Sequence, residues 1–390
     1  MKFADRLSRF KPSGTLAVNA KTLELRARGI AVTSLAVGEP DFATPMPIKA
    51  AAGKAIDGDF SRYTAVEGIA ELRQAVCGYY RRVYGVEVHP ENVVLTNGGK
   101  QSLFNALMAL VNPGDEVLIP SPYWTSYPDL VLLTGGTPLF VPSPSERGFR
   151  VTPDELEQAR TPRTRLLILN SPANPTGVVY TEQEIGALLE WAFSHDIMVL
   201  ADEIYDQLVY APARTVSTSS WWEKYPDRLV VVNGLSKAFA MTGWRVGYTV
   251  ADAALVREMS KIQGHITGNI CSIAQKAAVE ALTGSYECVD TMRAAFMRRR
   301  DMAYAEISSW PGVLCPRPEG AFYAFPDVSA LFTDSMPDDT ALCTMLLERA
   351  RVAVVPGTAF GDPRCIRLSY AVADDVLMDA LTRIRAALFA

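Results

Sequence analysis

Short runs of apolar, branched residues alternate with longer segments of helical spacing through the middle of the chain. The strand-like runs are residues 93–95, 116–119, 166–169, 198–200 and 229–232. Runs this short and this apolar are typical of strands covered on both faces. Residues 100–110 and 181–193 lie between such runs and repeat apolar positions at helical spacing. The alternation predicts a largely parallel sheet with helices on both sides.

The pattern changes after about residue 250. Helices are expected at residues 252–263, 272–282, 285–309, 340–350 and 373–388. Strand-like pieces are residues 321–325, 352–355 and 365–369. The sequence therefore predicts a large α/β domain followed by a smaller α+β domain.

Composition narrows the class of protein. The 38 basic and 43 acidic residues give a formal charge of -5, which argues against a nucleic-acid partner. No apolar run approaches the ~18 residues that cross a bilayer, and the first residues lack the apolar core of a signal peptide. The six cysteines are scattered without a CxxC pair, as expected of free thiols in a reducing compartment. We expect a cytoplasmic globular protein with no membrane partner.

Several catalytic motifs are absent from the sequence. It contains no GxxxxGK[ST] phosphate loop, no GxGxxG fingerprint, no HExxH zinc site and no GxSxG elbow. With three histidines, a histidine-rich metal site is disfavoured, and we expect no metal. The basic run 298–300 is expected to form a solvated helix face rather than a phosphate site.

Polar clusters instead follow the predicted strands, where open α/β sheets carry their sites. Residues 96–101 read T-N-G-G-K-Q and open a helix, so backbone N–H groups there could approach an anion. Residues 170–177 read N-S-P-A-N-P-T-G and form a rigid polar loop. Asp202 leaves an apolar strand, so its carboxylate is expected to be desolvated and to need a cationic partner. Tyr205, three residues on, can point into the same space.

The fourth cluster spans residues 233–248 and carries Lys237 among small and aromatic residues. Such surroundings lower the pKa of a lysine amine, which favours Schiff-base chemistry. Arg245 lies eight residues further on and could pair with an anionic group of the same ligand.

Together these motifs resemble the class I/II aminotransferases, which are fold-type I enzymes dependent on pyridoxal phosphate (PLP). The run S-K-A-F-A-M-T-G-W-R-V-G at 236–247 carries the resemblance, with 170–177 and A-D-E-I-Y at 201–205 before it. It extends over essentially the whole chain and is strongest to bacterial aspartate aminotransferases. The resemblance implies a PLP-binding large domain at residues 46–284 with a mostly parallel seven-stranded sheet flanked by helices. Residues 1–45 and 285–390 would form the small α+β domain with an N-terminal arm.

The resemblance also assigns the cofactor contacts. Lys237 would form the Schiff base with PLP and move protons as general base and acid. Asp202 would pair with the pyridine nitrogen, while Tyr205 and Asn174 hold the ring O3′ oxygen. The remaining cofactor residues are Gly98, Gly99, Lys100, Ser236 and Arg245 around the phosphate, Trp124 stacked on the ring, and Tyr63 reaching across from the second subunit of a homodimer.

Substrate contacts follow in the same way. Arg367 would clamp the α-carboxylate through its planar guanidinium, with Gly38, Asn174 and Trp124 beside it. Two departures matter. Position 234 is glycine where many members have a serine that binds the phosphate, so one phosphate contact is either missing or replaced by Ser236. No arginine lies in 265–272 to bind a side-chain carboxylate, a task that Lys100 with Ser13 and Thr15 can take in the resembling subgroup.

The function implied is aspartate:2-oxoglutarate transamination by a ping-pong cycle through pyridoxamine phosphate, with amino acids and 2-oxo acids as substrates. Alternatives within the class use prephenate, aromatic amino acids or alanine, and Lys100 does not separate prephenate from aspartate because both are dicarboxylates. A PLP-dependent lyase and a PLP-binding regulatory module are more remote. A regulatory module of that kind needs an added basic DNA-binding segment, and residues 1–30 are too short to supply one.

Overall fold

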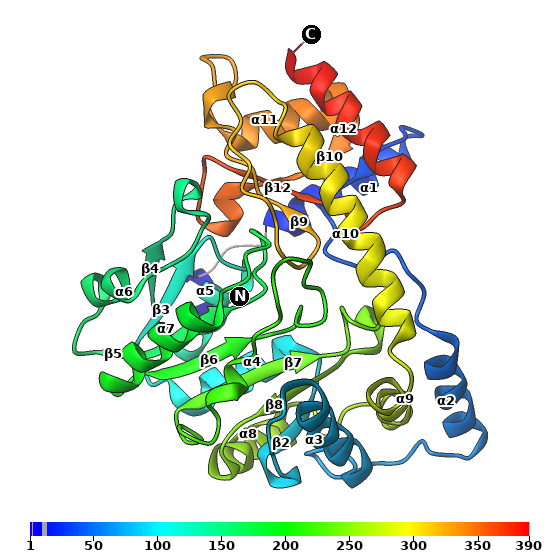
Figure 1. Ribbon diagram of the computed structural model, residues 1–390, viewed down its shortest axis with the longest axis vertical. Coiled ribbons are helices and arrows are strands. Elements are labelled where there is room, and N and C mark those ends of the chain that lie inside the picture. Colours follow the sequence, from blue (N-terminus) through cyan, green and yellow to red (C-terminus); the bar gives the residue numbers. More distant parts are fainter. Residues whose placement is uncertain (2, 10–13, 390) are drawn as a thin grey trace.

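The computed structural model describes residues 1, 3–9 and 14–389. The strands of its central sheet are β2 (Val93–Asn97), β3 (Glu116–Ser121), β4 (Thr137–Pro142), β5 (Thr164–Asn170), β6 (Met198–Asp202), β7 (Leu229–Gly234) and β8 (Val246–Val250). Their order is β2-β8-β7-β6-β5-β3-β4, and β8 alone runs antiparallel to its neighbours among the described strands (Figure 1). The mostly parallel seven-stranded sheet expected from the sequence is confirmed.

The apolar pattern did not predict two of these strands, β4 and β8. β4 is an edge strand, so its residues are partly exposed and it tolerates prolines at positions 138 and 142. These prolines break the continuous apolar run by which the other strands were predicted. β8 is interrupted by Gly247. A Cβ at Gly247 would lie 2.4 Å from the backbone of Gly98, so glycine there lets β8 approach the turn after β2.

Helices cover both faces of the sheet. The α-helices of the described chain are α1 (Gly14–Ala27), α2 (Met46–Asp57), α3 (Ala70–Tyr84), α4 (Gly99–Leu110), α5 (Ser126–Thr134), α6 (Pro153–Ala159), α7 (Glu182–Ser194), α8 (Ala253–Ile266), α9 (Ser272–Thr283), α10 (Glu287–Ile307), α11 (Asp339–Met345) and α12 (Asp374–Phe389).

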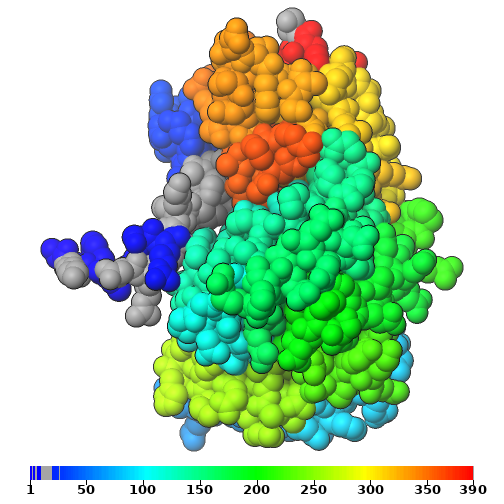
Figure 2. Space-filling model, turned by 90° about the vertical axis from the view of Figure 1, so that its left-hand side faces the viewer, coloured from blue at the N-terminus to red at the C-terminus, as the bar shows by residue number. Residues whose placement is uncertain are grey.

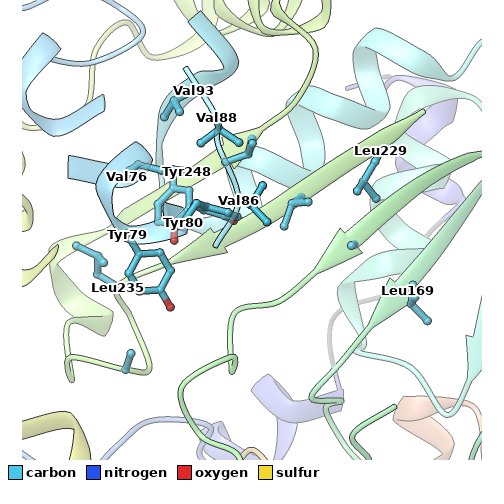
Figure 3. Packing of buried hydrophobic residues seen from close by; sticks show 14 of the residues in the cluster. Val76, Tyr79, Tyr80, Val86, Val88, Val93, Leu169, Leu229, Leu235 and Tyr248 are labelled. Carbon is cyan, nitrogen blue, oxygen red and sulfur yellow. The ribbon is translucent and has the colours of Figure 1, made fainter. Parts of the chain in front are cut away.

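The residues of β2 show how one strand supplies both layers of the core. Val93 and Leu95 pack with Tyr80 of α3 on one face, whereas Val94 packs with Leu103 of α4 on the other. Side chains alternate along a strand, so a run without polar residues needs cover on both sides. Figure 3 shows the first layer, where Tyr80 meets Tyr248 of β8 edge-on at 6.3 Å between ring centroids.

Two smaller sheets lie above the large one in Figure 1, with α10, α11 and α12 around them. In one, β1 (Thr33–Ser34) pairs in parallel with β10 (Val352–Ala353). In the other, β11 (Val355–Pro356), β12 (Ile366–Ser369) and β9 (Tyr323–Ala324) are antiparallel. This part of the chain matches the α+β pattern expected after residue 250.

The basic run on α10 corrects one expectation. Arg299 and Arg300 are buried, at 6% and 2% exposed, instead of forming a solvated face. Arg299 binds both carboxylate oxygens of Asp41 and also pairs with Asp374 at the start of α12. The segment around Asp41 and the start of α12 pair with Arg299, so this arginine joins elements instead of facing solvent. The expectation of a solvated side chain holds for Arg298, which is 57% exposed.

At the N-terminus, Figure 2 shows the dark-blue segment 3–9 projecting from the body of the molecule. Phe3 and Leu7 on it are 68% and 50% exposed. Within the described residues, none of the helices combines the length and apolar character needed to span a bilayer.

Candidate active site

A cavity of about 490 Å³ lies at the carboxyl ends of the central strands, between the large sheet and the β9–β12 sheet. Among the expected site residues, those lining it are Gly38, Gly99, Lys100, Trp124, Asn174, Asp202, Tyr205, Ser236, Lys237, Arg245 and Arg367. Gly98 lies beside Arg245 at its edge. Tyr63 is 97% exposed and lies outside the cavity of its own chain. Ser13 and the side chain of Thr15 fall outside the described residues.

Lys237 follows β7 and points into this cavity. Its Nζ donates a 2.6 Å hydrogen bond to the carbonyl of Gly38 and lies 5.7 Å from the ring centroids of Tyr205 and Phe322. Burial lowers the pKa of Lys237 to about 8, while the charge of Glu39 opposes the fall. The amine is therefore much more often neutral near pH 8 than an exposed lysine, as a nucleophile or a general base must be.

Asp202 ends β6 and is buried. Its Oδ2 accepts a 2.7 Å hydrogen bond from the hydroxyl of Tyr127, and its Oδ1 accepts one from the backbone N–H of Ile204. Burial raises the pKa of Asp202 to about 6. Among the described residues the carboxylate makes no ion pair, although the charge of Lys237 opposes the rise of its pKa. A cationic nitrogen of a bound ligand fits this position.

Arg367 lies on β12 and is 3% exposed. Its Nη1 donates to Asn174 Oδ1 at 3.0 Å, and its Nη2 donates to the carbonyl of Ala36 at 2.6 Å. Its Nε is buried with no partner in the described chain. A fixed guanidinium facing a cavity is suited to binding a carboxylate.

An anion cradle is formed where β2 ends and α4 begins. Gly98, the N-cap of α4, has φ +79°, and a Cβ there would lie 2.4 Å from Nη2 of Arg245. Lys100 lies on the first turn of α4, with its Nζ 4.9 Å from the Trp124 ring, and burial lowers its pKa. Helix N–H groups and two cations make this end of the cavity fit a phosphate.

The glycine at position 234 has a steric explanation. A Cβ at Gly234 would lie 2.9 Å from the carbonyl oxygen of Val246 and 3.0 Å from Cα of Gly247 on β8. A serine there would need β7 and β8 to move apart. Ser236, two residues further on, is buried and lines the cavity without such a constraint.

Three residues that orient the site had no role assigned from the sequence, although one of them, Asn170, opens the polar loop 170–177. The hydroxyl of Tyr127 donates a hydrogen bond to Asp202, and Oδ1 of Asn170 accepts a 2.9 Å hydrogen bond from the backbone N–H of Asn174. Tyr323 of β9 shares a 2.8 Å hydrogen bond with Tyr205. Tyr127 could have been found from its place three residues after Trp124, close to a residue that the resemblance assigned to the cofactor. Tyr323 gave no signal, because it sits in an apolar run whose pairing the sequence does not specify.

This arrangement suits a lysine-based enzyme with an anionic cofactor. Residues 30–384 match the aminotransferase class I and II family. The chain belongs to this family, whose members are aminotransferases, and membership implies PLP as the cofactor.

Individual relatives match over nearly their whole length. The chain is 48% identical to an aspartate/prephenate aminotransferase of Cereibacter sphaeroides, covering 98% of each protein. It is 42% identical to an asparagine–oxo-acid transaminase of Streptococcus mutans, covering 99% of this chain and 98% of the relative. A solved aspartate aminotransferase of Thermus thermophilus with maleate superimposes with a TM-score of 0.94 at 41% identity, over 99% of this chain and 100% of that one. The fold-type I architecture is thereby established.

Proposed function

We propose that this aminotransferase moves the amino group of aspartate to 2-oxoglutarate, using PLP bound in the 490 Å³ cavity. One observation carries the proposal: a lysine of lowered pKa, a buried carboxylate without a cationic partner and a buried arginine face one cavity. These are Lys237, Asp202 and Arg367.

The cofactor contacts follow from the groups present. Asp202 pairs with the pyridine nitrogen, and Trp124 covers the ring. The phosphate lies in the cradle of Gly98, Gly99, Lys100, Ser236 and Arg245. Tyr205 and Asn174 donate hydrogen bonds to the O3′ oxygen of PLP. Nδ2 of Asn174 is available for this, because only its Oδ1 has a side-chain partner among the described residues.

When bound, PLP supplies an electron sink for the charge left on the substrate Cα. Asp202 supports this role by keeping a positive charge on the ring nitrogen. Lys237 Nζ accepts the proton from the substrate Cα and later donates it, which a pKa of about 8 allows in both directions near neutral pH. The Gly38 carbonyl holds Nζ in place through their hydrogen bond.

The substrate is oriented by two cations. Arg367 binds the α-carboxylate. Lys100 binds the side-chain carboxylate together with Ser13 and Thr15. Two relatives support an acidic substrate by name, one acting on aspartate and prephenate and one solved with maleate, a dicarboxylate. Prephenate is the second candidate acceptor, because it is also a dicarboxylate and is named for one of these relatives. Asparagine is the competing amino donor, because another relative is named an asparagine–oxo-acid transaminase.

The assembly we propose is a homodimer in which Tyr63 reaches the phosphate of the partner's site. Its 97% exposure in the single chain supports this assignment. We further propose residues 46–284 as the large domain and residues 1–45 with 285–390 as the small one. The six cysteines are free, which supports a reducing compartment such as the cytoplasm.

Single half-reactions test the function. Protein loaded with PLP is mixed separately with aspartate, glutamate, asparagine, alanine and phenylalanine without any 2-oxo acid, and the visible absorbance is followed. We expect aspartate and glutamate to bleach it fastest, and 2-oxoglutarate to restore it. Faster bleaching by asparagine, alanine or phenylalanine would transfer the function to that substrate. A protein that gains no visible band with PLP would disprove the cofactor assignment.

A further inference from the structure

Tyr323 is a buried phenol that touches three residues of the proposed site. Its hydroxyl lies 2.8 Å from that of Tyr205, and its ring lies 4.5 Å below the guanidinium carbon of Arg367. A Cβ at Gly38 would lie 2.4 Å from the same hydroxyl, so glycine at position 38 makes room for it. Tyr323 is 1% exposed and lines the cavity.

The β9–β12 pairing fixes where this ring lies. Tyr323 is opposite Ser369 in the antiparallel register. Arg367 is two residues from Ser369 and therefore faces the same side of the sheet, which puts it diagonally next to Tyr323. Ala321, two residues before Tyr323, is anchored as well, since its N–H donates to the carbonyl of Leu208 at 2.8 Å. The hydroxyl of Tyr323 is thus presented by a rigid element.

The direction of the phenol–phenol hydrogen bond can be argued from the charges around it. Burial raises the pKa of both phenols, that of Tyr205 well above its ordinary value. The positive charge of the adjacent Arg367 is the strongest effect that lowers the pKa of Tyr323 and so opposes the effect of its burial. Tyr323 is therefore the more acidic phenol and the better donor, which leaves the hydrogen of Tyr205 free to point elsewhere.

We propose that Tyr323 is a positioning residue that donates its hydroxyl hydrogen to Tyr205 and so aims the hydrogen of Tyr205 into the cavity. The inference rests on the proposed function, in which Tyr205 donates to the O3′ oxygen of PLP. Tyr323 acts through Tyr205 and does not itself touch the cofactor. Its ring contact with Arg367 is a separate role that phenylalanine can also fill.

The test is a double-mutant cycle on PLP-loaded protein, read as the pH midpoint of the visible absorbance. A hydrogen donated to a charged oxygen favours the deprotonated form, so weakening the donation raises the midpoint. Tyr323→Phe should raise it by about 0.4 to 1 pH unit, the shift equivalent to one ordinary hydrogen bond. In a Tyr205→Phe background the same change should have no further effect, because the residue through which Tyr323 acts is gone.

Two further variants separate positioning from a general loss of packing. Tyr370→Phe is the matched control, since its buried hydroxyl lies 3.5 Å from the carbonyl of Ala321 outside the cavity, and it should leave the midpoint unchanged. Gly38→Ala pushes on the Tyr323 hydroxyl while keeping both phenols. It should raise the midpoint in the parent protein and not in the Tyr205→Phe background, even where Tyr323→Phe folds poorly.

The outcomes separate a failure of the positioning role from a failure of the proposed function. An unchanged midpoint in Tyr323→Phe, or an equal shift with and without Tyr205, overturns the positioning role and leaves the aminotransferase assignment standing. A parent protein that develops no visible band with PLP overturns both.

Discussion

Arg367 Nη1 donates a 3.0 Å hydrogen bond to Asn174 Oδ1, which joins residues 193 positions apart in the chain. One lies on β12 and the other in the loop after β5, so the bond spans the cavity between two sheets. A second bond, to the carbonyl of Ala36, holds the other end of the guanidinium. Arg367 is thus fixed before any ligand arrives, which lowers the entropy cost of binding a carboxylate.

A lysine amine should not replace this fixed guanidinium. Arg367→Lys keeps the charge but loses the planar fork, so kcat/KM should fall about 10- to 150-fold, the equivalent of a charge-assisted hydrogen bond. Because every amino acid has an α-carboxylate, aspartate and phenylalanine should lose equally. Steady-state rates with both donors measure this. Arg385→Lys, an exposed arginine of α12 paired with Glu306, is the control and should be neutral. A loss confined to aspartate would reassign Arg367 to the side-chain carboxylate.

Lys100 is predicted to act selectively. Replacing it with methionine removes a cation from the cavity while keeping an apolar stem against Trp124. We expect kcat/KM for aspartate to fall roughly 10- to 100-fold more than for phenylalanine, since only aspartate has a second carboxylate. The phosphate cradle loses the same charge, so PLP affinity is measured in parallel. Equal losses for both donors would limit Lys100 to the cofactor. Lys261→Met, on the exposed face of α8, serves as control.

Much of the fold could be read from the sequence because parallel strands buried on both faces leave continuous apolar runs. Strands β2, β3, β5, β6 and β7 were all predicted this way. β4 was not, since an edge strand has no need of an unbroken apolar run. The burial of Arg299 could not be predicted either. Its partners Asp41 and Asp374 lie 258 and 75 positions away, and only tertiary packing brings them together.

The site was predictable to the extent that its residues end strands. Asp202 and Lys237 follow apolar runs, so their position in the sheet and their desolvation follow from the pattern. The pairing of Tyr205 with Tyr323 could not be predicted, because it depends on how the β9–β12 sheet sits against the large one. The cationic partner expected for Asp202 forms no ion pair with it among the described side chains, which leaves that position to the nitrogen of a bound ligand.

Lys237 should leave a signature in the pH dependence of stability of protein without PLP. Its pKa falls from 10.5 to about 8 on folding, so the unfolded chain binds more protons between these values. Stability therefore rises with pH across this window, by about 1.4 kcal/mol per pH unit at most. Lys237→Met removes the effect. Urea unfolding at pH 8 and pH 10 should show the parent gaining relative to the variant, and a constant difference between them would contradict the lowered pKa.

The shared dimer site can be tested by mixing subunits of two impaired variants. Lys237→Ala should abolish turnover, at least about 10⁴-fold, by removing the general base together with the cofactor anchor. Tyr63→Ala should weaken a site in the other subunit. In a hybrid dimer, the site that keeps Lys237 receives an intact Tyr63 from the Lys237→Ala subunit. Refolding equal amounts together should therefore restore about a quarter of the native sites, since half the dimers are hybrids with one good site each.

The hybrid experiment distinguishes a Tyr63 that contributes to the partner's site from one that contributes to the site of its own chain. If Tyr63 served its own chain, each site of a hybrid would lack either the lysine or the tyrosine, and mixing would restore nothing. A mixture of Lys237→Ala with Asp202→Ala subunits provides the control for complementation within one site. Both residues line the same cavity of one chain, so each hybrid site lacks one of them and no activity should return. Recovery with Tyr63→Ala and none with Asp202→Ala would place Tyr63, 97% exposed in the single chain, at the partner's phosphate.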